Sequence, residues 1–163
     1  MLALGLLGGC ATSQAPSARS DVASKPDAQH GPWQGRFSVK VWGQQVQAFS
    51  SNFELQGSPE QGQLELSSVL GYVLARMRWD GDGATLESTS NSPPGPRHFA
   101  TLQEMAEKVL GVDIPAALLF AWVQGQQVSD TDWTTDTSQW QDGRISAKRL
   151  SEPRADVLIL LDR

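Results

Sequence analysis

Alternating apolar and polar residues dominate the chain from Trp33 to Leu86. A first segment places Phe37, Val39 and Val41 between polar or basic neighbours, which predicts a half-buried strand. The same period of two recurs in four further segments, whose apolar members are Phe49, Phe53 and Leu55; Leu64 and Leu66; Val73, Ala75, Met77 and Trp79; and Ala84 and Leu86. Short strands at this spacing, joined by Gly-rich turns, predict an antiparallel meander with one apolar face.

A helical pattern follows the proline-rich loop at residues 91–96. Thr101 and Glu104 fit a capping box, which predicts the start of a helix. The apolar residues of this helix recur at helical spacing. They are Leu102, Met105, Ala106, Val109 and Leu110. Gly111 follows the last of them, and we expect the helix to end there.

Pro115 is well placed as the first residue of a second predicted helix. We expect this helix to run to about Gln124 and to end at Gly125. This helix is apolar on all sides and is too short to cross a bilayer, so the sheet must cover it or it must fill a cavity. Strands are predicted again at residues 144–149 and 157–161, and the last is apolar on both faces, which is typical of a central strand. This order of elements predicts a mainly β fold, a strongly curved antiparallel sheet covered on its concave side by helices.

The N-terminal residues differ in composition from this folded part. An apolar stretch at residues 1–7 and two glycines precede Cys10, the only cysteine of the chain. This is the pattern of a bacterial lipoprotein processing site, and it predicts a signal peptide at residues 1–9 and a lipid on the Cys10 thiol. No basic residue precedes the apolar stretch, so we expect the translation start to lie upstream or the segment to be trimmed.

Residues 10–31 are predicted to form the lipidated N-terminus and a flexible tether. From residue 11 onward this segment has only Val22 as an aliphatic residue beyond alanine, too little apolar surface to offset the entropy of ordering it. About 20 flexible residues reach on the order of 25 Å. The folded domain is therefore expected at residues 32–163, held near a membrane and free to turn.

Composition and charge narrow the classes of function. The net charge of −5 argues against a nucleic-acid binder that neutralises phosphates. Six tryptophans and five phenylalanines against one tyrosine suit a dry interior or an apolar cavity. The histidines, His30 and His98, have no metal-ligand spacing, and the chain has none of the common nucleophile, phosphate-loop or dinucleotide motifs. We therefore expect no enzyme activity, no cofactor and no metal, and we interpret the acidic cluster of Asp130, Asp132 and Asp136 as a solvated loop.

The predicted hairpin between the third and fourth strands has an unusual tip. Hairpin tips usually carry Asn, Asp, Gly or Ser. Here Val69 and Leu70 stand next to Gly71. Two interpretations stay open: the loop folds back and buries Leu70, or it forms a wedge that touches a membrane or a cargo.

The chain resembles the LolB family of outer-membrane lipoprotein receptors in the lipid-attachment site and in most of the domain, from Trp33 to about Gly125. The segments that carry the resemblance are Trp33-Gln34-Gly35-Arg36-Phe37-Ser38-Val39, Val69-Leu70-Gly71, Gly111-Val112-Asp113-Ile114-Pro115 and Trp122-Val123-Gln124-Gly125. The resemblance implies a half-open antiparallel barrel with a helical lid of two or three helices over an apolar cavity. The chain departs from the family pattern at Val69, where the family usually has Pro. It also has a short region after Gly125, which puts closure of the barrel in question.

The same resemblance implies a function. The family takes lipoproteins from the periplasmic carrier LolA and places them in the outer membrane, so acylated lipoproteins, a LolA-like carrier and outer-membrane lipid are the expected partners of a monomer. The expected location is the periplasmic face of the outer membrane, through a lipid anchor, and Ala11 after Cys10 favours that location. The protruding loop of the family carries a leucine needed for insertion, and the matching residue is Leu70, flanked by Val69 and Gly71.

We expect the acyl-chain cavity to be lined by the large apolar residues of the strands and of the second helix. They are Phe37, Phe49, Phe53, Leu64, Leu66, Met77, Trp79, Leu118 and Trp122. Each of them is also a candidate for sealed core. An alternative function for the whole chain is a structural or assembly lipoprotein that binds other envelope proteins.

Overall fold

The computed structural model describes residues 30–90, 94–128 and 130–163. Cys10, the predicted signal peptide at residues 1–9 and nearly all of the segment 10–31 lie outside the described residues. The lipid attachment and the tether therefore stay predictions.

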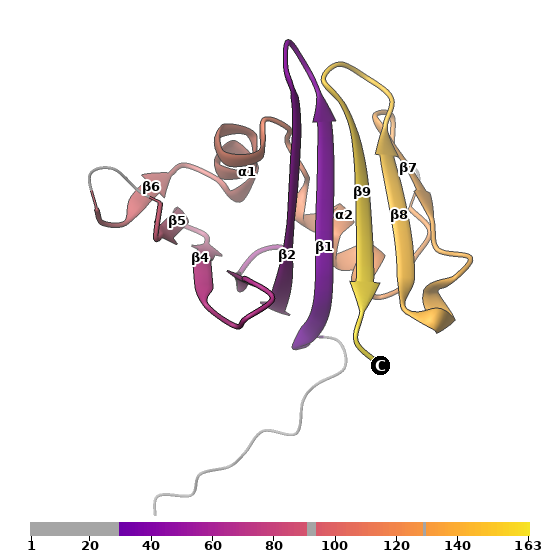
Figure 1. Cartoon of the computed structure of the whole chain (residues 1–163), viewed down its shortest axis with the longest axis horizontal. Helices are drawn as coiled ribbons and strands as arrows, with labels where there is room; N and C mark the ends of the chain where they lie inside the picture. The colour runs from indigo at the N-terminus through magenta and orange to yellow at the C-terminus, as the bar shows by residue number, and fades with distance from the viewer. Residues whose placement is uncertain (1–29, 91–93, 129) are drawn as a thin grey trace, which may run out of the picture.

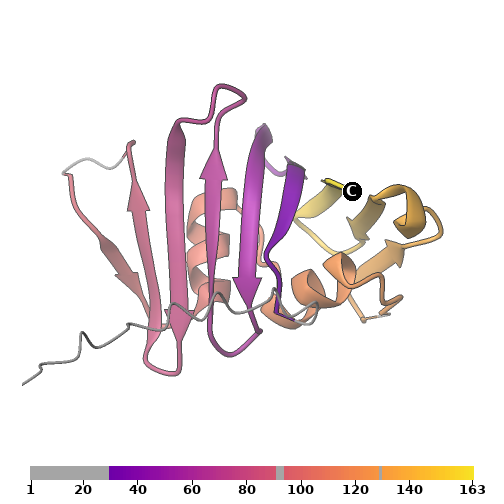
Figure 2. The same ribbon diagram turned by 90° about the horizontal axis from the view of Figure 1, so that it is seen from below.

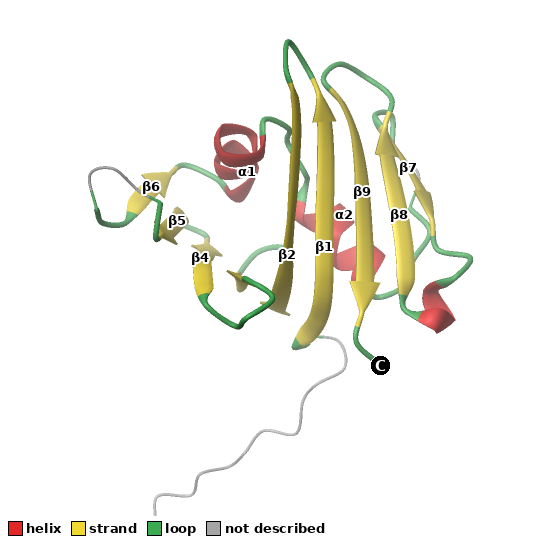
Figure 3. Cartoon of the chain, in the orientation of Figure 1, coloured by secondary structure: helices red, strands yellow, loops and turns green. Residues whose placement is uncertain are grey.

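The described chain forms one antiparallel sheet of nine strands with two α-helices and a short 3₁₀ helix (Figures 1 and 3). The strands lie side by side in the order β6-β5-β4-β3-β2-β1-β9-β8-β7. Their bounds are β1 Trp33–Trp42, β2 Val46–Gly57, β3 Gly62–Ser67, β4 Val73–Asp80, β5 Gly83–Ser88, β6 Arg97–Phe99, β7 Trp133–Asp136, β8 Arg144–Arg149 and β9 Arg154–Leu161. The helices are α1 Leu102–Leu110, α2 Ala116–Val123 and the 3₁₀ helix η1 Trp140–Asp142.

The predicted meander is confirmed, because β1 to β5 pair in sequence order. The pairing of β9 with both β1 and β8 confirms the expectation of a central last strand. Two strands, β6 and β7, were not predicted. They have three and four residues, too few for a period of two to stand out.

Both α-helices lie on the same, concave face of the sheet (Figure 2). Within the described residues, the edge strands β6 and β7 do not pair with each other, so the sheet stays open. This arrangement confirms the predicted mainly β fold, a half-open barrel with a helical lid. Three strands follow Gly125, and they extend the sheet beyond β1 without closing it.

The first helix begins and ends at the predicted residues. The Thr101 hydroxyl accepts the N–H of Glu104 at 3.0 Å, as an N-cap should. The Glu104 carboxylate accepts the N–H of Ala100 at 2.9 Å, one residue earlier than in a standard capping box. Gly111 ends the helix in the left-handed conformation, with φ of 75°.

The second helix lies within the core. Its buried residues include Phe120, which meets Trp33 and Trp79 edge to face with ring centroids 5.6 and 6.1 Å apart. Trp122 meets Trp133 of β7 in the same way at 5.4 Å. The core cluster lies between Trp33 and Leu161, so a chain that begins at Ala11 keeps every residue of it.

Candidate functional site

A small apolar cavity of about 50 Å³ lies between the sheet and α1. Six of the predicted cavity residues line it: Phe37, Phe53, Leu64, Leu66, Met77 and Trp79. The rest of its wall comes from Leu55, Leu102, Ala106, Leu110, Ile114, Leu119 and Ile159. We call this the inner cavity. Its volume is far below the roughly 300–1,000 Å³ of pockets that hold small ligands.

A larger pocket of about 400 Å³ lies beside it, and we call this the outer pocket. The predicted residue Phe49 lines it, together with Leu66 and Met77. Its other walls are Val39, Val41, Ala48, Leu74, Ala75, Leu86, Val109 and Leu110, with Gln47, Ser88 and Ser90 as its polar members. This volume falls within the range of ligand pockets.

The inner cavity and the outer pocket share three wall residues. Leu66, Met77 and Leu110 line both spaces. Leu66 and Met77 come from β3 and β4, whereas Leu110 is the last residue of α1. The partition between the two spaces is therefore a single layer of flexible side chains, and one of them belongs to the helix.

Two predicted cavity residues lie elsewhere. Leu118 and Trp122 line neither space. Leu118 is 5 % exposed and Trp122 is fully buried. Trp122 packs edge to face against Trp133 of β7 instead. In this structure both residues are sealed core.

Sequence reasoning missed the contribution of α1 to the inner cavity. Leu102, Ala106 and Leu110 recur every four residues and thus form one face of the helix. That spacing was visible in the sequence, but it does not say which part of the sheet the face meets. The tertiary fold places it across the inner cavity from side chains of β1 to β4.

The hairpin turn at residues 68–72 leaves its apolar side chains in solvent. Val69 is 76 %, Leu70 79 % and Tyr72 70 % exposed. The interpretation in which the loop folds back and buries Leu70 is therefore wrong. Figure 2 shows this turn at the top of the view, where it projects beyond the ends of the neighbouring strands.

The backbone of the hairpin turn is tightly ordered. The N–H of Ser68 donates to the carbonyl of Tyr72, and the N–H of Gly71 donates to the carbonyl of Ser68, both at 2.9 Å. Gly71 has φ of +84°, a conformation that favours glycine. This is the pattern of a three-residue hairpin loop with a left-handed glycine at its end.

Part of the wall of the outer pocket lies at the base of the hairpin turn. Leu66 lies two residues before Ser68, and Leu74 lies two residues after Tyr72. Both side chains line the outer pocket. The wall of the outer pocket therefore reaches to within two residues of each end of the hairpin turn.

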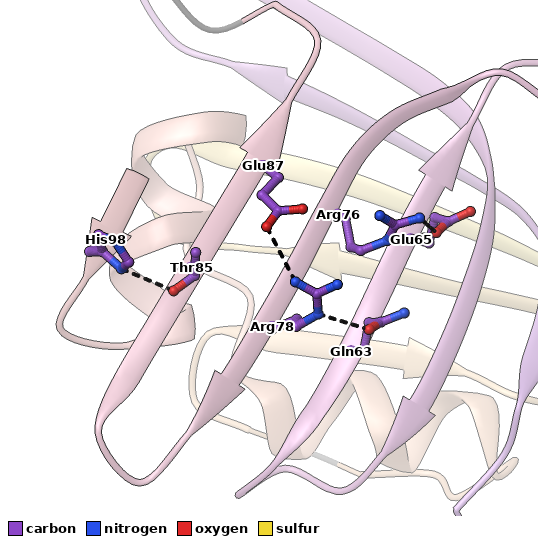
Figure 4. Close-up of polar contacts among 7 residues, drawn as sticks. All are labelled: Gln63, Glu65, Arg76, Arg78, Thr85, Glu87 and His98. Atoms are coloured by element: carbon purple, nitrogen blue, oxygen red, sulfur yellow. Dashed lines mark hydrogen bonds and ion pairs between the residues drawn. The ribbon is translucent and has the colours of Figure 1, made fainter. Parts of the chain in front are cut away.

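The outer face of β3 to β5 is polar instead (Figure 4). Arg76 pairs with Glu65 at 2.6 Å, and Arg78 reaches Gln63 at 3.1 Å and Glu87 at 3.3 Å. The Oγ1 atom of Thr85 on β5 lies 3.1 Å from the Nδ1 atom of His98 on β6. Partly exposed pairs of this kind contribute little to stability. They keep this face hydrated. The hairpin turn, in contrast, exposes apolar side chains in this part of the sheet.

The helices differ in how firmly they are held. α1 buries only Met105, whereas α2 buries five residues, Leu118, Phe120, Ala121, Trp122 and Val123. The loop between them is tied by Asp113, which pairs with Arg149 of β8 at 3.1 Å and accepts a hydrogen bond from Gln103 of α1 at 2.7 Å. α1 is thus the less buried cover of the pocket.

The acidic residues after α2 form a hydrogen-bonded loop. The Thr131 hydroxyl bonds to Asp130 and lowers the pKa of that carboxyl, and the Ser138 side chain does the same to the pKa of Asp136. No group of three or more His, Cys, Asp or Glu in the described part of the chain could hold a metal ion. Nor does any helix in residues 30–90, 94–128 and 130–163 have the length and apolarity to span a membrane.

An apolar pocket on the concave side of an open antiparallel sheet, covered by a helix and lined in part at the base of an exposed apolar turn, places the chain in the class of half-open barrels with a helical lid. Residues 32–152 match the family model of the outer membrane lipoprotein LolB. The chain belongs to the LolB family, and it is an outer-membrane lipoprotein.

Two relatives carry the name outer-membrane lipoprotein LolB. The protein of Shewanella amazonensis is 25% identical over 162 aligned residues, which cover 86% of this chain and 74% of the relative. The protein of Ralstonia nicotianae is 31% identical over 131 residues, which cover 80% of this chain and 61% of the relative. The match to the second relative thus spans about three fifths of its length.

Proposed function

We propose that this chain accepts acylated lipoproteins from a LolA-like periplasmic carrier and inserts them into the outer membrane. The observation that carries the proposal is the position of the outer pocket at the base of the hairpin turn, through Leu66 and Leu74. An acyl chain that leaves the pocket along these residues meets Leu70, which is 79 % exposed. The binding pocket and the exposed turn then lie next to each other on β3 and β4.

The energy of transfer comes from burying the acyl chains. Each buried methylene contributes about 0.8 kcal/mol, so an acyl chain does not cross water unshielded at a useful rate. Cargo moves from the carrier to the receptor if the receptor has the higher affinity for acyl chains. It moves on to the membrane because the membrane has a higher affinity still. The chain itself acts by binding and transfer, and no nucleotide is required for that sequence of affinities.

Cargo binding requires α1 to move. The inner cavity, at about 50 Å³, is too small for an acyl chain. Displacement of Leu110 joins the inner cavity to the outer pocket, because Leu110 lines both. α2 stays fixed by the contacts of Phe120 and Trp122 with the aromatic residues of the sheet. We assign α1 as the movable lid and α2 as its fixed neighbour.

The N-terminal segment completes the proposal. Removal of residues 1–9 leaves Cys10 as the lipidated first residue, and residues 10–31 act as the tether. The lipid on Cys10 fixes the protein in the membrane where the cargo must arrive. The domain at residues 32–163 then works as a monomer, with its hairpin turn within reach of the bilayer.

The test uses the chain from Ala11, which keeps the whole core. An acylated lipoprotein bound to its periplasmic carrier is mixed with this chain and with phospholipid vesicles. Cargo on the receptor and cargo in floated vesicles are then measured separately. We expect Leu70→Glu to accept cargo as the parent chain does and to deliver at least tenfold less to vesicles, because a carboxylate does not enter the acyl region.

Leu150→Glu is the matched control. Leu150 is also exposed, at 59 %, but it lies between β8 and β9, far along the sheet from the hairpin turn. This variant should deliver cargo normally. Delivery by Leu70→Glu at the rate of the parent chain would contradict the role of the hairpin turn, and a parent chain that takes up no acylated cargo would contradict the whole proposal.

A further inference from the structure

We propose that Ser68 is a positioning residue that prepares the hairpin turn for insertion into a membrane. The inference rests on the proposed function, in which the turn enters the bilayer. The Ser68 hydroxyl oxygen accepts the backbone N–H of Leu70 at 3.3 Å and that of Tyr72 at 3.2 Å. One half-buried hydroxyl thus serves two amides of an exposed turn.

The main chain of Ser68 completes the same arrangement. Its carbonyl accepts the N–H of Gly71 at 2.9 Å, and its own N–H donates to Tyr72. The three consecutive N–H groups of residues 70, 71 and 72 therefore all donate to oxygen atoms of Ser68. The side chain of Asn52, on β2, donates to the same carbonyl at 3.2 Å and ties the turn to the sheet.

This arrangement matters in a membrane more than in water. In water, an amide of an exposed turn that loses its acceptor bonds to solvent instead. In the hydrocarbon region there is no solvent acceptor, so each unsatisfied amide opposes insertion. Ser68 removes that penalty for Leu70 and Tyr72, and the exposed side chains of Val69 and Leu70 then gain by leaving water.

The Ser68 hydroxyl also restrains the backbone of the turn. Proline is favoured at the second position of such a turn because it fixes the backbone there, and this chain has Val69. Gly71 adds backbone freedom, because glycine has no Cβ to restrict its dihedral angles. The two bonds to the Ser68 hydroxyl restrain the turn in place of a proline.

The experiment compares three variants of the chain from Ala11. Ser68→Ala removes the acceptor, Ser68→Thr keeps a hydroxyl at the same position, and Ser67→Ala removes the neighbouring hydroxyl on β3. Partition into vesicles of phosphatidylethanolamine and phosphatidylglycerol is measured by flotation without cargo. We expect Ser68→Ala to partition on the order of tenfold more weakly, and the other two variants to behave as the parent chain does.

A second measurement separates insertion from folding. The chain from Ala11 contains no cysteine, so Val69→Cys gives one attachment point for an environment-sensitive fluorophore. With vesicles, the label should shift to an apolar environment in the parent background and much less with Ser68→Ala. Without vesicles, the thermal midpoints of the two chains should nearly coincide, since the turn is hydrated in both.

The outcomes distinguish this inference from the function on which it rests. Normal partition of Ser68→Ala together with weak partition of Leu70→Glu would overturn the role of Ser68 and leave the proposed function standing. Normal partition of both variants would overturn the inference and the role of the hairpin turn together. An equal loss in Ser67→Ala, or a loss that follows a lowered thermal midpoint, would also overturn the role of Ser68.

Discussion

The carboxylate of Asp113 lies 3.1 Å from the guanidinium of Arg149, an ion pair that joins the loop after α1 to the end of β8. Both side chains are largely buried, at 12 % exposure for Arg149 and 27 % for Asp113. The same carboxylate accepts the amide of Gln103 on α1. Asp113 therefore holds the lid helix to the part of the sheet that lies beyond the pocket.

Asp113→Asn should loosen the lid. The variant loses the charge that Arg149 needs in its partly buried position, and we expect the free energy of unfolding to fall by about 1–3 kcal/mol. Uptake of a fluorescent acyl probe should become faster, because α1 moves more easily. Urea denaturation and stopped-flow fluorescence measure the two effects.

Glu152→Gln provides the control for that variant. Glu152 pairs with Arg154 at 3.4 Å, but the side chains are 75 % and 69 % exposed. Its loss should change neither stability nor uptake, as is usual for a surface pair. An uptake rate in Asp113→Asn equal to that of the parent chain would show that α1 is not the rate-limiting cover.

Leu110→Trp should block the pocket. Leu110 lines the inner cavity and the outer pocket, and the outer pocket, at about 400 Å³, has room for a larger ring. We expect the fold to persist and the affinity for an acyl probe to fall at least tenfold. Leu150→Trp, which adds the same ring at a distant exposed site, should bind the probe normally. Equal affinity in both variants would place the acyl chain outside these two spaces.

Leu118→Ala and Phe49→Ala should separate core from pocket. Leu118 is 5 % exposed and lines neither space, so its truncation should lower the free energy of unfolding by about 2–5 kcal/mol without changing probe affinity in the folded protein. Phe49 lines the outer pocket and is only partly buried. Its truncation should weaken probe binding at a smaller cost in stability. Denaturation and probe titration of both variants decide the assignment, and the opposite pattern would reject it.

Val69→Pro should stabilise the hairpin turn. The residue holds the second position of a turn that begins at Ser68, where the fixed backbone angle of proline is favoured. We expect a gain of about 0.4–1 kcal/mol in the free energy of unfolding, measured by thermal denaturation. In the Ser68→Ala background, the same change should restore part of the vesicle partition. A loss of stability would contradict the turn geometry described for residues 68–72.

Local patterns predicted most of the elements. The alternation of Phe37, Val39 and Val41 predicted the buried face of β1, because successive side chains of a strand point to opposite faces. The capping residues Thr101 and Gly111 predicted both ends of α1. β6 and β7 escaped this reasoning, since strands of three and four residues form only when a neighbouring strand pairs with them.

The candidate site also combines features that local patterns predict with features that depend on long-range packing. Local periodicity is enough to place Val69 and Leu70 at a hairpin tip, because the strands on either side each show an alternation of apolar and polar residues. Long-range packing was needed to establish that these side chains stay exposed, that the wall of the outer pocket reaches the base of their turn, and that Leu118 and Trp122 belong to sealed core. Exposure and pocket shape depend on how distant segments such as α1, β4 and β7 pack together. An apolar side chain carries the same local signal whether it faces a cavity or another side chain.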